Sequence, residues 1–66
     1  MSDLFGGPTP QDVSVDEQIT CVKREIAMRE RVYPRWVDGG RMTQKAADTE
    51  LLLMRAVLLT LEKARG

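Results

Sequence analysis

The sequence contains no histidine and only one cysteine, Cys21. A disulfide therefore cannot form within the chain, and zinc lacks the imidazole and thiolate ligands that it usually takes. No histidine is available to activate Cys21 as a nucleophile, so we expect its side chain to be a small buried apolar group. The composition predicts a protein without a metal, a cofactor or a catalytic residue.

An excess of charge of either sign and long apolar runs are also missing. Ten basic residues balance ten acidic ones, so no net field draws the chain to nucleic acid or to a membrane surface. The apolar run at residues 51–54 is only four residues long, whereas about 20 are needed to cross a bilayer. The first residues lack the basic and apolar stretches of a secretory signal, and a lone cysteine suits a reducing compartment. We expect a cytoplasmic protein with no membrane contact.

A chain of 66 residues has room for one small domain. Such a chain buries only about 60 % of the surface that its unfolded form exposes, and its core supplies roughly 3–5 kcal/mol. Small domains usually add disulfides, a metal or a second subunit to such a core. A disulfide is excluded and the usual zinc ligands are missing, so the size predicts self-association or docking on a partner.

The first helix signal begins at Ser14. Ser14 and Glu17 have the spacing of a capping box, in which each side chain accepts a hydrogen bond from the backbone amide of the other residue. Gly39 and Gly40 then supply a C-terminal stop, because glycine accepts the left-handed conformation that ends many helices. These signals predict a helix over residues 15–38.

Pro34 lies inside this predicted helix. A proline has no backbone N–H and costs about 3 kcal/mol in a regular helix interior. The helix therefore either kinks at Pro34 or ends near Val32 and continues as an irregular turn. We expect the kinked helix, because Tyr33, Trp36 and Val37 keep the apolar spacing running to the glycines.

A second helix is expected over residues 44–64, with Thr43 as its N-terminal cap. The intervening loop, residues 39–42, is so short that the two helices must lie antiparallel. Residues 1–13 contain several glycines and prolines and little helical periodicity, which predicts a flexible tail. The expected fold class is therefore all-α, an antiparallel two-helix hairpin over residues 14–66.

Both predicted helices have apolar arcs that cover about half of the circumference, and Leu53 and Val57 widen the second one. Packing on a single neighbouring helix needs a narrower stripe. The surplus predicts that two hairpins associate, as a homodimeric four-helix bundle. The residues expected in the core and in self-association are Ile19, Val22, Ile26, Tyr33, Trp36, Leu51, Met54, Leu58 and Leu61.

Three charged residues fall within these apolar arcs. Glu25 and Arg29 lie four residues apart in the first helix, and Glu50 lies in the second. A carboxylate beside a cation can serve catalysis, but no nucleophile or metal ligand set accompanies these residues. We favour an interface salt bridge that fixes register and partner choice.

Basic residues alternate with aromatic ones around Pro34, where Arg29, Arg31, Arg35 and Arg41 accompany Tyr33 and Trp36. Such a patch can bind phosphates while the rings stack on exposed bases. Acidic neighbours dilute its charge, and the two rings lie on or beside the core stripe. A nucleic-acid binder is therefore the third of our hypotheses.

The N-terminal residues Asp3, Leu4 and Phe5 form a short motif of one acidic and two large apolar residues on the tail. They resemble the motif by which bacterial replication and repair proteins dock on the sliding clamp: glutamine, any residue, a small or acidic residue, leucine and phenylalanine. Met1 stands where that motif has glutamine. The resemblance implies an adaptor that binds the clamp through Leu4 and Phe5; otherwise these residues are an ordinary start sequence.

A second resemblance covers residues 23–61. The segments 24–29, 32–35 and 40–42, followed by an Ala-, Leu- and Met-rich helix, resemble small, mostly uncharacterised helical proteins of tailed phages and prophages. The resemblance implies an accessory role in phage biology and a bacterial host or phage protein as partner. Our leading hypothesis is thus a non-enzymatic interaction module that binds itself and such a protein, ahead of the clamp adaptor and the nucleic-acid binder.

Overall fold

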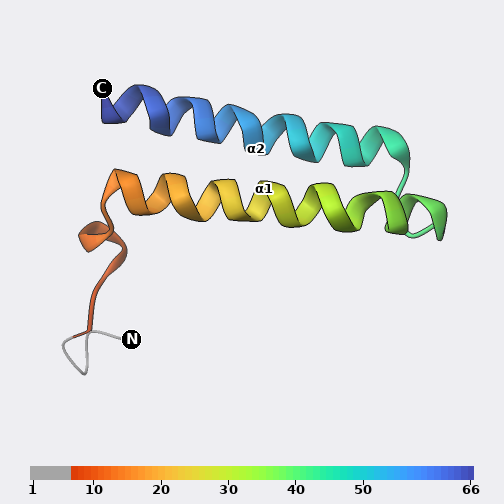
Figure 1. Cartoon of the computed structure of the whole chain (residues 1–66), viewed down its shortest axis with the longest axis horizontal. Coiled ribbons are helices and arrows are strands. Elements are labelled where there is room, and N and C mark those ends of the chain that lie inside the picture. The colour runs from red at the N-terminus through yellow and green to blue at the C-terminus, as the bar shows by residue number, and fades with distance from the viewer. Residues whose placement is uncertain (1–6) are drawn as a thin grey trace.

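The structure of the protein is a computed structural model, and it describes residues 7–66. These residues form a one-turn 3-10 helix, η2 (Pro10–Asp12), and two long helices, α1 (Val15–Asp38) and α2 (Gln44–Arg65). The two long helices run antiparallel and pack side by side, and a tight turn joins them (Figure 1). Residues 7–66 contain no strand. The predicted all-α hairpin is confirmed, and only the end of the second helix differs, by one residue.

The capping box predicted at the start of α1 is present. The Ser14 hydroxyl accepts the Glu17 N–H at 3.0 Å, and the Glu17 carboxylate accepts the Ser14 N–H at 2.9 Å. Two amides that the first turn leaves without a helical partner are thereby satisfied. The hydrogen bonds from the Ser14 amide and then its hydroxyl hold the pKa of Glu17 below its ordinary value.

Residues 10–12 give the described part of the expected tail one turn of structure. The Asp12 carboxylate accepts hydrogen bonds from the Thr9 amide at 2.9 Å and from the Thr9 hydroxyl at 3.1 Å. These bonds, the amide first, lower the pKa of Asp12. The turn is local, because both partners lie three residues apart and are solvent-exposed or nearly so.

Pro34 lies inside α1, which continues without a break to Asp38. The alternative in which the helix ends near Val32 is therefore wrong. Glu30 and Pro34 are both exposed, and Pro34 cannot donate the helical hydrogen bond that the Glu30 carbonyl would otherwise accept. A kink at this position stays a prediction.

The turn after α1 depends on Gly40, whose φ is 76°. This left-handed conformation lets the Arg41 N–H donate back to the Trp36 carbonyl at 2.8 Å, as in a Schellman motif. The chain then enters α2 at Thr43, whose hydroxyl accepts the Ala46 N–H at 3.0 Å. The caps of both helices thus agree with the sequence prediction.

The core of a single hairpin is thin. Only Ile19, Ile26 and Tyr33 of α1 and Ala47 of α2 are buried among the described residues. Most other residues predicted for the core are half-buried: Val22, Leu51, Met54, Leu58 and Leu61. One hairpin therefore does not enclose the apolar surface that its sequence provides.

Two predicted positions differ in the structure of the single chain. Trp36 is 38 % exposed, and Cys21 is exposed although we expected it to be buried. Cys21 is two residues, about 200°, beyond Ile19 on α1 and therefore points away from α2, whereas Trp36 lies beside the stripe that meets α2. Within one hairpin, α2 buries neither side chain.

Candidate interaction surface

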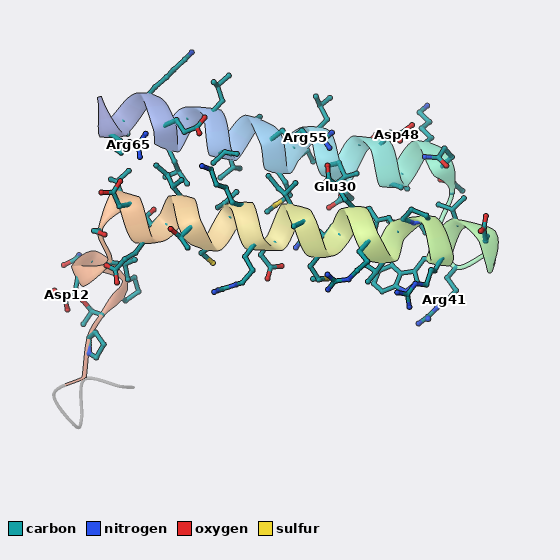
Figure 2. All side chains as sticks on the ribbon, viewed as in Figure 1. Asp12, Glu30, Arg41, Asp48, Arg55 and Arg65 are labelled. Atoms are coloured by element: carbon teal, nitrogen blue, oxygen red, sulfur yellow. The ribbon has the colours of Figure 1, made fainter. Side chains whose placement is uncertain are left out.

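One flank of the hairpin carries the ion pairs that join α1 to α2. The Arg55 guanidinium pairs with the Glu30 carboxylate, and Arg65 pairs with Asp16 at 3.4 Å. Figure 2 shows Arg55 and Glu30 pointing toward each other between the two helices. We call this side the polar flank. Its two pairs show which levels of α1 and α2 lie opposite each other.

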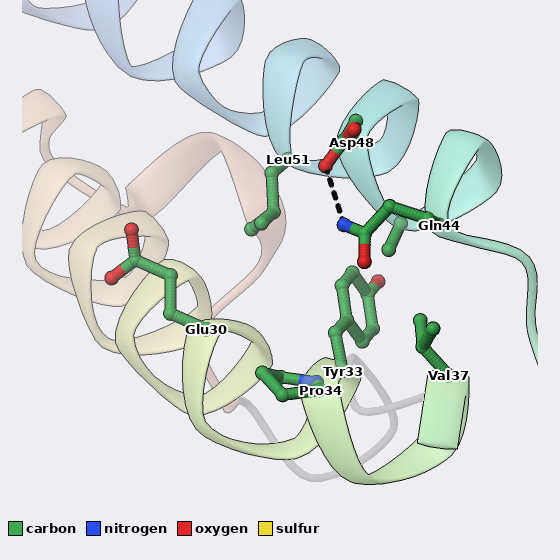
Figure 3. A pocket seen from close by; sticks show the side chains of 8 residues that line it. Glu30, Tyr33, Pro34, Val37, Gln44, Asp48 and Leu51 are labelled. Atoms are coloured by element: carbon green, nitrogen blue, oxygen red, sulfur yellow. Dashed lines mark hydrogen bonds between the residues drawn. The ribbon is translucent and has the colours of Figure 1, made fainter. Parts of the chain in front are cut away.

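A shallow groove opens on the polar flank near the turn (Figure 3). Tyr33 and Ala47, both buried, lie at the contact between the helices, and the Gln44 amide donates to the Asp48 carboxylate at 2.9 Å across the rim. No nucleophile beside a base lines this groove. Within residues 7–66, no cluster of cysteine and acidic side chains has the grouping that a metal ion needs.

The opposite flank has a different character. Leu53 is two residues from Arg55 on α2, and Val32 is two residues from Glu30 on α1, so each points about 200° away from its charged neighbour. Leu53 is 56 % exposed and Val57 is 47 % exposed. A groove lined by Leu53, Ala56, Val57, Thr60 and Leu61 runs along α2 on this side.

Residues on this flank recur at alternating steps of four and three, as in a coiled-coil seam. On α1 the set is Gln18, Val22, Glu25, Arg29, Val32 and Trp36. On α2 it is Ala46, Glu50, Leu53, Val57, Thr60 and Ala64. We call these two rows together the open seam, because within the hairpin they have no helix packed on them. The sequence predicts Val22 and Trp36 for self-association and Leu53 and Val57 as a widening of the apolar arc. It also predicts Glu25, Arg29 and Glu50 for an interface salt bridge.

Of the three charged residues of the open seam, two form an ion pair within residues 7–66 and one does not. Arg29 pairs with Glu25 at 3.6 Å, and their side chains are 28 % and 38 % exposed. Glu50 makes no ion pair within the described residues 7–66. Glu50 and Arg29 nevertheless line one groove together with Met28, Val32 and Trp36. The expected pair Glu25–Arg29 is therefore present, and Glu50 is left without a cation.

The four arginines considered for nucleic-acid binding do not share one surface. Arg29 lies in the open seam, whereas Arg31 and Arg35 are exposed and point away from it, about 200° and 240° further round α1. The Arg41 guanidinium lies 5.4 Å from the centroid of the Trp36 ring, at the turn. The tail residues Asp3, Leu4 and Phe5 lie outside the described residues.

Neither helix of the described chain has a stretch that is both long and apolar enough to cross a bilayer. The chain matches no known protein family, no curated protein and no solved structure. The resemblance to phage proteins and the resemblance of the tail to clamp-binding motifs therefore rest on their short sequence segments alone.

Proposed function

We propose that the protein is a non-enzymatic protein–protein interaction module that self-associates through the open seam, so that two hairpins form a homodimeric four-helix bundle. The observation that carries this proposal is the exposure of Leu53 and Val57 beside an apolar groove, in a hairpin with only four buried residues among residues 7–66. Soluble monomers rarely expose a large contiguous apolar patch, and such patches usually mark interaction sites.

The energetics of the small core support the same proposal. Full burial of a leucine, valine or phenylalanine-sized side chain contributes about 1.5–3 kcal/mol. In a symmetric dimer each residue of the seam is buried twice, once in each copy. Leu53, Val57, Val32 and Trp36 are already about half buried in one hairpin, so each adds only part of that value. Counted in both copies, they reach the scale of the roughly 4–15 kcal/mol that association costs in lost freedom.

The alternatives receive less support. The adaptor hypothesis depends on Leu4 and Phe5, which lie outside the described residues, so no structural observation favours it. The nucleic-acid hypothesis treats Arg29, Arg31, Arg35 and Arg41 as one surface, but only Arg31 and Arg35, four residues apart, share a side of α1. A phage or host protein as a further partner is part of the proposal only through the sequence resemblance.

A matched pair of leucines on α2 provides the test. Leu53 and Leu59 have nearly equal exposure, 56 % and 53 %, but only Leu53 belongs to the open seam. Leu53→Glu should convert a dimer into a monomer, whereas Leu59→Glu should leave the dimer intact, because a new carboxylate at position 59 stays in water. Size-exclusion chromatography with light scattering gives the mass directly.

The natural chain should have about twice its monomer mass of 7.5 kDa at micromolar concentration. Circular dichroism must show that both variants remain helical. A natural chain that is a cooperatively folded 7.5 kDa monomer would overturn the proposal. Equal dissociation of the two variants would show that the open seam is not the interface.

A further inference from the structure

Glu50 limits how a second copy can cover the open seam. It lines the groove that also contains Arg29 and Trp36, and it has no ion pair within residues 7–66. A second hairpin over this groove would remove Glu50 from water, and a buried carboxylate without a cation is strongly destabilising. Arg29 is the only basic residue of the open seam in either copy. The cation for Glu50 must therefore be an Arg29.

Two identical hairpins can face each other about a two-fold axis in two ways. With the axis along the helices, α1 of each copy packs on α2 of the other, and both turns lie at the same end. With the axis across the helices, α1 packs on α1 and α2 on α2, and the turns lie at opposite ends. We call these the same-end and the opposite-end arrangements.

The same-end arrangement gives each Glu50 a cation, the Arg29 of the other copy, which also pairs with Glu25 of its own chain. Arg29 and Glu50 line one groove, so they lie at neighbouring levels of the hairpin, and this symmetry brings Glu50 of one copy over Arg29 of the other. It also sets the large Trp36 near the small Ala46 of the other copy, since both lie next to the turn. In the opposite-end arrangement, with the helices fully overlapped, Glu50 instead meets the part of α2 near Thr60, where the open seam has no cation.

We propose that a second copy of this chain docks in the same-end arrangement, with Arg29 of each copy paired to Glu50 of the other. This inference rests on the proposed self-association and adds its geometry. The start of α1 and the end of α2 lie at one end of the hairpin (Figure 1). The dimer would therefore have the starts of both α1 helices at one end.

Charge exchange between two variant chains tests the pairing. Arg29→Glu and Glu50→Arg each place two like-charged pairs in a homodimer, and each should raise the dimer dissociation constant at least about tenfold. In a 1:1 mixture, the two variants restore two opposite-charge pairs in a heterodimer. The mixture should therefore dimerise within about threefold of the natural chain. Sedimentation equilibrium, with one variant fluorescently labelled, measures all three constants.

Arg31→Glu is the matched control, because it makes the same change of charge two residues away on the exposed side of α1. It should leave dimerisation unchanged and gain nothing from mixing with Glu50→Arg. If the natural chain dimerises but mixing Arg29→Glu with Glu50→Arg gives no preferred heterodimer, the same-end arrangement is overturned and the proposed function stands. If the natural chain is a monomer, both proposals fall together.

A distance measurement decides the arrangement even if the charge variants do not fold. In a Cys21→Ser, Asp38→Cys chain, a spin label marks the turn end of α1. The same-end arrangement predicts a separation below about 30 Å between the two labels of a dimer, because both turn ends lie together. The opposite-end arrangement predicts roughly 35 Å or more, from the 1.5 Å rise per residue along α1. A dominant long distance would overturn the proposal.

Discussion

Arg41 contacts Trp36 twice, once through the backbone and once through the side chain. Its N–H donates to the Trp36 carbonyl at 2.8 Å, and its guanidinium lies 5.4 Å from the Trp36 ring centroid. The ring of Trp36 is in turn 5.7 Å from that of Tyr33, which is buried against α2. At this end of the hairpin, a continuous row of contacts therefore runs from the turn at Arg41, through Trp36, to Tyr33 at the contact between the helices.

The turn requires a left-handed backbone conformation at Gly40. Its φ of 76° is a conformation that costs an ordinary residue roughly 1–2 kcal/mol, although no atom would obstruct an added Cβ. Gly40→Ala should therefore lower the free energy of unfolding by about that amount. Gly40→Asn should cost less, because asparagine tolerates the left-handed region. Urea denaturation at a fixed protein concentration measures both values, and equal costs for the two variants would contradict this explanation.

The capping box should make the stability of the protein depend on acid. Hydrogen bonds from Ser14 lower the pKa of Glu17 in the folded state. Since the folded-state value lies below the unfolded one, this stabilisation is fully present above the unfolded pKa and is lost as the pH falls through the folded pKa. Acidification should thus fray the start of α1, which circular dichroism and thermal unfolding detect.

Glu17→Gln provides the control for this pH dependence. A glutamine at N3 still accepts a hydrogen bond from the Ser14 amide, but it does not titrate. The variant should show a smaller loss of thermal stability than the natural protein between neutral and acidic pH. Identical pH profiles for the two proteins would assign the acid sensitivity to other carboxylates, with Asp12 as the next candidate because its pKa is also lowered.

The sequence predicts the ends of the helices well because the signals there are local. Ser14 and Thr43 each cap a helix through a residue three positions away, and Gly40 meets a requirement of its own backbone. The exposure of individual side chains is less predictable from the sequence. Periodicity gives the direction of Cys21 and Trp36 around α1, but it does not say which half of a wide apolar arc the other helix covers.

That information depends on contacts between distant residues. The pairs Glu30–Arg55 and Asp16–Arg65 join positions 25 and 49 residues apart, and they show which flank is the polar one. Only then does the open seam become visible as a second row of heptad spacing. The same reasoning explains the arginines, since residues that are close in sequence, such as Arg29 and Arg31, face different sides of a helix.

The last prediction separates the core of the hairpin from its exposed surface. Ile26 is buried between α1 and α2, whereas Leu52 is 67 % exposed on the outer side of α2. Ile26→Ala removes buried methyl and methylene groups and leaves a cavity, so it should lower the free energy of unfolding by about 2–5 kcal/mol. Leu52→Ala should change it by no more than about 0.5 kcal/mol, because the leucine side chain is already in water.

Both variants must be compared with the natural chain at one protein concentration, since the stability of a self-associating chain rises with concentration. A large loss for Leu52→Ala would mean that the outer side of α2 is covered in solution, and that the open seam is not the interface that dominates stability.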